Sequence, residues 1–116
     1  MDARPKRRPA VFFRTETGAE PVREWLKSLS RKDRLTIGED IKDVEFSWPV
    51  GMPLCRSLGE ELWEVRTRLD DRVARVFFCV SGELMVLLHG FIKKSRRTPK
   101  GDLDLARRRK RELEKP

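Results

Sequence analysis

The stretch that decides the fold is LWEVRTRLDDRVARVFFCVSGELMVLLHGFI, which occupies residues 62–92. Its beginning alternates between apolar and charged residues. Apolar Trp63 and Val65 point to one side of an extended chain, whereas charged Glu64 and Arg66 point to the other. The pattern predicts a strand with one face in the core and one charged face.

Two turn signals divide the rest of this stretch, Asp-Asp at 70–71 and Ser-Gly at 81–82. They leave two further strands, residues 72–80 and residues 83–92. Tight turns between successive strands predict an antiparallel meander. Residues 84–88 are apolar on both faces, so the third strand is expected to be central in the sheet.

Apolar residues at helical spacing precede these strands. Those of the first predicted helix are Val22, Trp25, Leu26 and Leu29. Thr17 with Glu20 and Ser30 with Asp33 have the spacing of helix-capping pairs, so they are expected to start two helices. The second helix is expected to run to about Phe46. Almost no loop separates the two, which predicts a helical hairpin packed on one face of the sheet.

The two ends of the chain complete the predicted fold. Residues 10–14 are expected to form a short first strand, and the segment after Pro99 a basic C-terminal helix with a thin apolar stripe. Residues 1–9 show no apolar period and are interpreted as a frayed basic arm. Residues 10–116 then form one small domain of the α+β class.

The net charge of +8 is unevenly distributed along the 116 residues. Residues 1–14 carry a net +4 and residues 93–116 a net +7, whereas residues 15–92 carry a net −3. A positive field of this kind attracts polyanions, of which RNA and DNA are the commonest in cells. Composition therefore favours contact with nucleic acid, although a merely solubilising surface has the same composition.

Membrane, secretory and metal-dependent functions are not expected. No apolar run is long enough to cross a bilayer or to form the core of a signal peptide, which predicts a cytoplasmic protein. Cys55 and Cys79 lack metal-binding spacing, and the chain has a single histidine, His89. We therefore expect two reduced, packed thiols, no metal site and no cofactor.

The charged row Glu64, Arg66 and Arg68 lies on the face opposite Trp63. If the helices cover the Trp63 side, this row faces solvent or a cleft, as a solvated surface or as a functional one. Arg75 interrupts an otherwise buried strand. Because an unpaired buried charge is costly, its guanidinium must either form a salt bridge, for example to Glu64, or bind a ligand such as a phosphate.

His89, Phe91, Lys93 and Lys94 follow one another at the end of the predicted central strand. His89 is either a packed core residue or a catalyst, and Phe91 is either core or a platform for a base. We expect the two lysines to converge with the arginines of the neighbouring strands at one end of the sheet.

Such a cluster has the residue types that RNA cleavage through the 2′-hydroxyl needs: a base, an acid and cations that stabilise the phosphorane. His89 or Glu64 fits the base. His89 or a lysine of lowered pKa fits the acid. Arg66 and Arg75 fit charge stabilisation, because arginine does not lose its proton in proteins.

Several short motifs follow one another in a recognisable order: Val22-Arg23-x-Trp25-Leu26, Arg56-x-Leu58-Gly59, Leu62-Trp63-Glu64-Val65-Arg66, Arg75-Val76-Phe77-Phe78, Leu87-Leu88-His89-Gly90-Phe91-x-Lys93-Lys94 and Thr98-Pro99. Their combination resembles the phage-derived HigB-type toxins of the RelE/ParE superfamily. The resemblance extends from about Val11 to Glu112, nearly the whole chain.

This resemblance implies the toxin of a type II toxin–antitoxin pair, an endoribonuclease that cleaves mRNA on the ribosome and inhibits translation. It also implies neutralisation by a helix-turn-helix antitoxin of the HigA type, with a toxin–antitoxin hetero-oligomer as the expected assembly. By position, Arg66, Arg75 and Lys94 match the family's basic substrate-facing residues. Arg56 stands where relatives often have lysine.

The predicted catalytic residues are therefore Glu64, Arg66, Arg75, His89 and Lys94. The residues predicted to bind RNA or the ribosome are Arg56, Arg68, Phe91, Lys93, Arg96 and Arg97. Some RelE-type enzymes use a tyrosine in cleavage and this chain has none, so the acid and the base stay open. The alternative function is that of a non-catalytic nucleic-acid-binding protein or a ParE-like toxin that poisons DNA gyrase.

Overall fold

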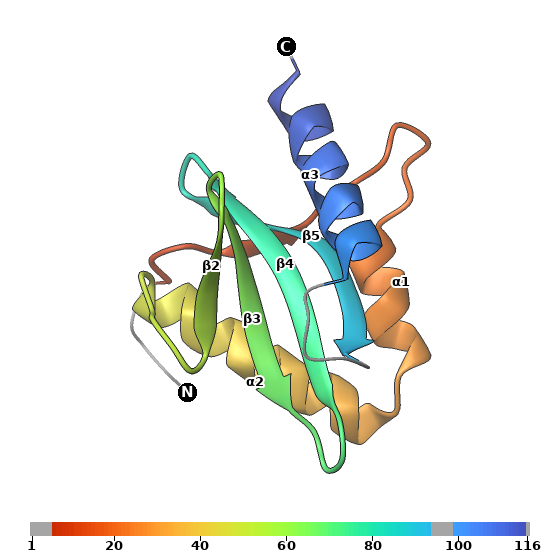
Figure 1. The fold of residues 1–116 in the computed structure, drawn as a ribbon, viewed down its shortest axis with the longest axis vertical. Coiled ribbons are helices and arrows are strands. Elements are labelled where there is room, and N and C mark those ends of the chain that lie inside the picture. Colours follow the sequence, from red (N-terminus) through yellow and green to blue (C-terminus); the bar gives the residue numbers. More distant parts are fainter. Residues whose placement is uncertain (1–5, 94–98, 116) are drawn as a thin grey trace.

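The computed structural model describes residues 6–93 and 99–115. Five strands form one mixed sheet in the order β1-β5-β4-β3-β2 (Figure 1). The strands are β1 (Ala10–Phe12), β2 (Cys55–Gly59), β3 (Leu62–Arg68), β4 (Val73–Ser81) and β5 (Leu84–Lys93). The predicted meander of β3, β4 and β5 is confirmed, and β5 lies between β1 and β4 as its two apolar faces indicated.

Two features of the sheet differ from the prediction. β2 was not predicted as a strand, yet it pairs antiparallel with β3, and the register of this pair shifts between Ser57 and Gly59. The first strand pairs with β5 in parallel, so the sheet is mixed. The local sequence predicted β1 as a strand but not its partner or its direction, because pairing depends on a segment far away in the chain.

Three helices cover the sheet: α1 (Pro21–Ser28), α2 (Arg31–Ser47) and α3 (Lys100–Glu114). The start of α2 is as predicted, because the Ser30 hydroxyl accepts a hydrogen bond from the Asp33 backbone N–H at 3.1 Å. The capping pair predicted for α1 is wrong. Glu20 itself is the N-cap residue, without a side-chain cap, and Pro21 opens the helix.

The helices are divided between the two faces of the sheet (Figure 1). α1 and α2 form the predicted hairpin and pack on one face, where Val22, Ile37 and Val44 join the apolar side of the strands. α3 packs on the opposite face, where Ala106 is fully buried and Leu103 lies against the strands. We call this second surface the α3 face.

A close approach between helix and sheet explains the glycine that follows His89. A Cβ atom placed on Gly90 would lie 2.4 Å from Cε3 of Trp25, so the indole of α1 occupies the space that any side chain would need. Gly90 therefore serves the packing of α1 on β5, and its place beside His89 has a structural reason.

The frayed N-terminal arm is corrected for residues 6–9, while residues 1–5 lie outside the described part. The backbone N–H groups of Arg7 and Arg8 donate to the Glu45 carbonyl oxygen at 2.9 and 3.0 Å, and Lys6 forms an ion pair with the Glu45 carboxylate. The Pro9 carbonyl oxygen accepts from Met85 N–H at 2.9 Å. This segment is docked along the end of α2 and the start of β5.

Cys55 and Cys79 are both buried and form no disulfide, as expected. Burial raises the pKa of each thiol to about 11, so both are protonated at neutral pH. Within the described ranges, no helix is long and apolar enough to cross a membrane.

Candidate functional site

The α3 face carries two cross-strand rows of the predicted site residues. In the first row, Arg56 of β2 pairs with Glu64 of β3, which pairs with Phe77 of β4, which in turn pairs with His89 of β5. In the second row, the partners across β3, β4 and β5 are Arg66, Arg75 and Phe91. Alternation along each strand keeps all of these side chains on one face. Of the cations predicted to converge, Arg66, Arg75 and Lys93 lie on this face, and Lys94 lies outside the described residues.

Glu64 and Arg75 form a buried ion pair at the centre of these rows. Both side chains are 0% exposed. The Nε of Arg75 donates a hydrogen bond to Oε2 of Glu64, and Nη2 forms an ion pair with the same oxygen. The expectation that Glu64 faces solvent or a cleft is therefore wrong. Arg75 was predicted either to form a salt bridge or to bind a ligand, and the salt bridge is observed. Glu64 holds the Arg75 guanidinium in place, and its fully buried carboxylate is not accessible to a substrate.

Two aromatic rings pack against Arg75. Its guanidinium carbon lies 5.3 Å from the ring centroid of Phe77 and 5.5 Å from that of Phe91. The Phe91 ring stacks on His89, with centroids 5.4 Å apart and 22° between the planes. Phe91 thus supports both Arg75 and His89 from within the site, and of its two predicted roles the packed one is observed.

His89 has a partner that the sequence did not single out for this purpose. Its Nε2 lies 2.5 Å from Oδ1 of Asp102, in the first turn of α3. Arg109 of the same helix donates a hydrogen bond from Nη1 to the Leu88 carbonyl oxygen at 2.8 Å. A carboxylate on one imidazole nitrogen fixes the orientation of the ring and leaves Nδ1 for other contacts. No sequence pattern pointed to Asp102 as the partner of His89, because this contact depends on where α3 docks on the sheet.

Lys93 is the last residue of β5 and lies at the end of the site. Burial, followed by the positive charges of Arg66 and Arg75, lowers the pKa of its ammonium group. Lys93 was predicted to bind RNA, whereas the lysine predicted to be catalytic is Lys94, which lies outside the described residues. A lowered pKa is also what a lysine that acts as an acid requires.

The accessible cations lie at the open side of the cluster. The Arg66 side chain is 29% exposed, and its Nε is 3.9 Å from Oε1 of Glu64. Arg56 and Arg68 are exposed. Arg66 and Arg68 also line a cavity of about 440 Å³ together with Asp40, Pro53, Leu54 and Val73. Cations that reach solvent beside a fixed, buried guanidinium form a surface suited to phosphate groups.

Three predicted site residues, Lys94, Arg96 and Arg97, lie outside the described residues. Within residues 6–93 and 99–115, no group of three or more histidine, cysteine, aspartate or glutamate side chains is arranged to hold a metal ion. The chemistry available from the described side chains is that of fixed guanidinium groups, one ammonium group of lowered pKa and one imidazole oriented by a carboxylate.

The fold and this site define a small α+β protein with a cationic sheet face. The family model of the phage-derived Gp49-like proteins matches residues 24–111, from α1 through most of α3. The chain belongs to this Gp49-like family, which is toxin-like and of the kind found in toxin–antitoxin systems. No curated protein matches the chain.

Proposed function

We propose that this protein is the toxin of a toxin–antitoxin pair and that it cleaves mRNA on the ribosome. The observation that carries the proposal is the juxtaposition of Arg66, Arg75 and Lys93 with His89 on one sheet face. Membership in the Gp49-like family supports the toxin part of the proposal. The cleavage part rests on the chemistry of the residues.

The proposed reaction is attack of a ribose 2′-oxygen on the adjacent phosphorus. A base removes the 2′-hydroxyl proton, the new 2′-O–P bond forms, and the P–O5′ bond breaks as an acid protonates the leaving oxygen. The products are a 2′,3′-cyclic phosphate and a 5′-hydroxyl. The phosphorane carries more negative charge than the ground-state phosphate, so fixed cations stabilise it selectively.

The geometry favours a division of roles among the described residues. His89, oriented by Asp102, is the preferred base. Lys93, whose pKa is lowered, is the preferred acid because a lower pKa eases proton donation. Arg66 reaches the phosphate from the open side, and Arg75 contributes its charge from beneath. Glu64 acts as a positioning residue for Arg75.

The partner part of the proposal is a helix-turn-helix antitoxin that neutralises the toxin by forming a hetero-oligomer with it. Binding by such a partner would explain how a cell survives while it produces a protein that cleaves its mRNA. Co-expression of the gene next to this one is expected to restore growth if that gene encodes the antitoxin.

Induced expression in a bacterial host tests the proposal. The wild-type chain is expected to arrest growth and to create new mRNA 5′ ends at codon-framed positions. Arg66→Ala is expected to slow cleavage by about 10²- to 10³-fold, the usual cost of removing one transition-state cation or donor, and so to relieve arrest. Lys93→Ala is expected to act in the same direction.

Arg23→Ala is the matched control, because Arg23 lies on α1, on the other side of the sheet, and is exposed. It should arrest growth like the wild type. Arrest with intact mRNA and damaged DNA would instead support the gyrase-poisoning alternative. Undiminished toxicity of both Arg66→Ala and Lys93→Ala would show that the proposed site is wrong.

A further inference from the structure

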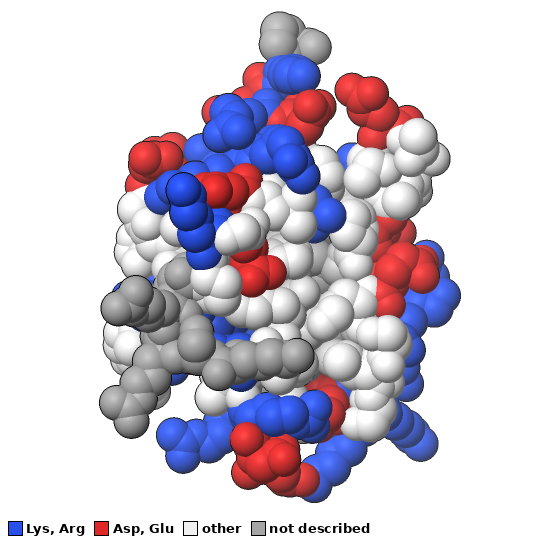
Figure 2. All heavy atoms as spheres, turned by 45° about the vertical axis from the view of Figure 1, so that its right-hand side comes forward, with Lys and Arg blue, Asp and Glu red and all other residues white. Residues whose placement is uncertain are grey.

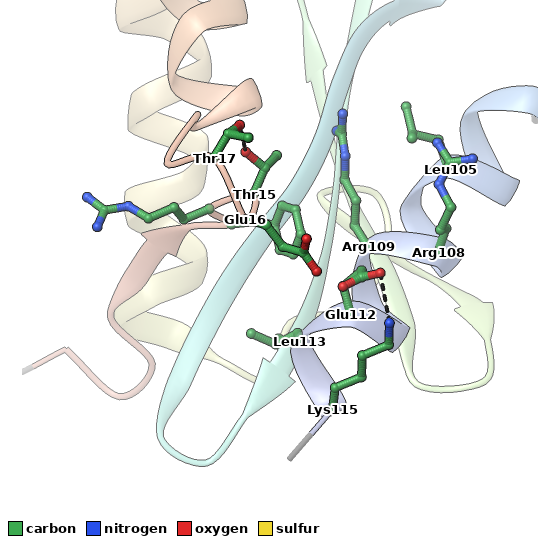
Figure 3. Close-up of a pocket in the computed structure, with 11 residues that line it drawn as sticks. Thr15, Glu16, Thr17, Leu105, Arg108, Arg109, Glu112, Leu113 and Lys115 are labelled. Carbon is green, nitrogen blue, oxygen red and sulfur yellow. Dashed lines mark hydrogen bonds and ion pairs between the residues drawn. The ribbon is translucent and has the colours of Figure 1, made fainter.

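A groove separate from the cationic rows lies between α3 and the loop that joins β1 to α1. It has a volume of about 770 Å³. In Figure 3, Thr15, Glu16 and Thr17 of the loop face the last turns of α3 across it. The α3 side of the groove is formed by Leu105, Arg108, Arg109, Glu112, Leu113 and Lys115. Nothing in the proposed cleavage uses this groove.

The groove combines an apolar lining with an excess of positive charge. Leu105, Leu113 and Phe13 supply the apolar part, and Leu113 is 36% exposed. Four basic residues line the groove against two acidic ones. Figure 2 shows basic side chains gathered over the α3 part of the molecule, with some acidic ones among them.

The charges in the groove are not balanced internally. The Glu112 carboxylate is turned to Lys115, 3.1 Å from its ammonium nitrogen, as the dashed line in Figure 3 marks. Among the described residues, no carboxylate lies within ion-pair distance of Arg108. Burial and the charge of Arg108 together lower the pKa of the neighbouring Arg109. Two adjacent guanidinium groups without an acidic partner of their own provide a place for external carboxylates.

We infer that this groove binds an acidic amphipathic segment of a partner protein, with apolar side chains against Leu105 and Leu113 and carboxylates toward Arg108 and Arg109. The wall from Leu105 to Lys115 is roughly 15 Å long at the rise of an α-helix, which suits a segment of about ten helical residues. The inference goes beyond the proposed function and holds whether or not the chain cleaves RNA.

RNA fits this groove less well than a peptide does. Glu16 and Glu112 line it, and their carboxylates repel phosphate groups. Among the described residues of the lining, the single aromatic one is Phe13, which is buried and so offers no open ring on which a base could stack. A phosphodiester backbone has no apolar group that could pack against the exposed side chain of Leu113.

A bound segment at this place would contact the helix that also holds the site. Arg109 lines the groove and donates to Leu88, next to His89, and Asp102 of the same helix contacts His89 itself. The groove and the cationic site therefore share one helix.

Selection from a phage-displayed library of random 12-residue peptides on the purified full chain tests this inference. The enriched peptides are expected to combine Asp or Glu with Leu, Ile or Phe at helical spacing. The best peptide should bind Arg108→Glu at least tenfold more weakly than wild type. Arg111→Glu, the same change on the same helix but outside the groove, should bind within twofold of wild type.

Amide NMR shifts upon peptide addition should concentrate at residues 13–17 and 105–115. The inference is overturned by no enrichment, by enriched peptides without acidic residues, or by equal losses in the two variants. It is also overturned if single-stranded RNA, and not peptide, shifts the groove amides. Growth arrest is measured in a separate experiment. The proposed cleavage can therefore be contradicted while peptide binding is observed, and peptide binding can be absent while cleavage is observed.

Discussion

The two faces of the sheet are built on different principles. Beneath α1 and α2, the strands present an apolar surface, in which Val65, Val76 and Phe78 are fully or almost fully buried. Beneath and beside α3, the same strands bury the Glu64–Arg75 ion pair. A buried ion pair is a weak source of stability compared with apolar residues of similar size. Among the described residues, the ion pairs of the other side, Asp33 with Arg72 and Glu45 with Lys6, each keep one partly exposed partner, whereas Glu64 and Arg75 are both fully buried. We interpret this fully buried pair as the mark of a site, and the other face as the support that holds the site in place.

The largest expected effect comes from breaking the buried pair. Glu64→Ala leaves the Arg75 guanidinium buried without its carboxylate, which should lower the free energy of unfolding by about 3–5 kcal/mol. Urea denaturation measures this. Glu39→Ala, at an exposed position of α2, is the control and should change stability by less than about 0.5 kcal/mol.

A double replacement separates stability from function at the same position. Glu64→Leu with Arg75→Met exchanges the pair for apolar side chains and should restore most of the stability lost in Glu64→Ala. The double variant should still fail to arrest growth. Full toxicity of a stable double variant would show that the ion pair serves the fold alone. It would contradict the claim that the α3 face is built for a site.

The next effect concerns the supporting face. Gly90→Ala would place a Cβ against the Trp25 indole and should cost about 1–3 kcal/mol by overpacking. Gly38→Ala is the opposite case, since it is exposed within α2 with nothing near its Cβ, and it should stabilise by about 0.5–1 kcal/mol. Thermal unfolding distinguishes the two. A neutral Gly90→Ala would mean that α1 does not press on β5 as described.

A smaller effect is expected where α3 meets the sheet. Asp102→Ala removes the contact to His89, which is partly exposed, and should loosen α3 by about 1 kcal/mol. Hydrogen exchange of α3 amides should then quicken about fivefold, while α2 amides keep their rates. Asp104→Ala, exposed on the same helix, should leave both unchanged. Equal loosening of α2 would show that the two faces are not held independently.

The smallest expected effect is a titration shift. Arg66 is among the groups that lower the pKa of Lys93, so Arg66→Gln should raise that pKa toward the ordinary value for lysine. The sign follows because removal of a nearby positive charge favours the protonated amine. NMR titration of the lysine side-chain Cε signals measures the shift. An unchanged pKa in Arg66→Gln would place Arg66 too far from Lys93 for a shared site.

Much of the fold could be predicted because the decisive patterns are local. Alternation in β3 identified its charged face, and the apolar run of β5 identified a strand with neighbours on both sides, although the middle strand of the five is β4. The Ser30 cap was readable from two residues three positions apart. β2 was missed although only two residues separate it from β3, because its sequence CRSLG shows no alternation of apolar and polar residues. The docking of residues 6–9 was not readable because it depends on the distant residues Glu45 and Met85.

The candidate site divides along the same line. Alternation was enough to bring Arg66 and the neighbouring cations to one face. The burial of Glu64 against Arg75 depends on cross-strand register and on what covers the strands. The contact of Asp102 with His89 depends on where α3 docks, which its thin apolar stripe did not specify. Contacts between residues far apart in the sequence therefore determine which charged side chains are buried in fixed positions and which remain accessible to solvent.

The central claim is that the accessible cations of the α3 face bind an RNA strand, and the salt dependence of RNA binding tests it most directly. A 2′-O-methylated RNA, which lacks the attacking hydroxyl, can be titrated by fluorescence anisotropy at several NaCl concentrations. Arg66→Ala with Lys93→Ala should weaken binding and reduce the slope of log affinity against log salt by about 1.4, for two lost phosphate contacts. Arg23→Ala with Arg31→Ala, on the helices of the other face, should keep the wild-type slope. A wild-type slope and affinity in the Arg66 and Lys93 double variant would contradict the account.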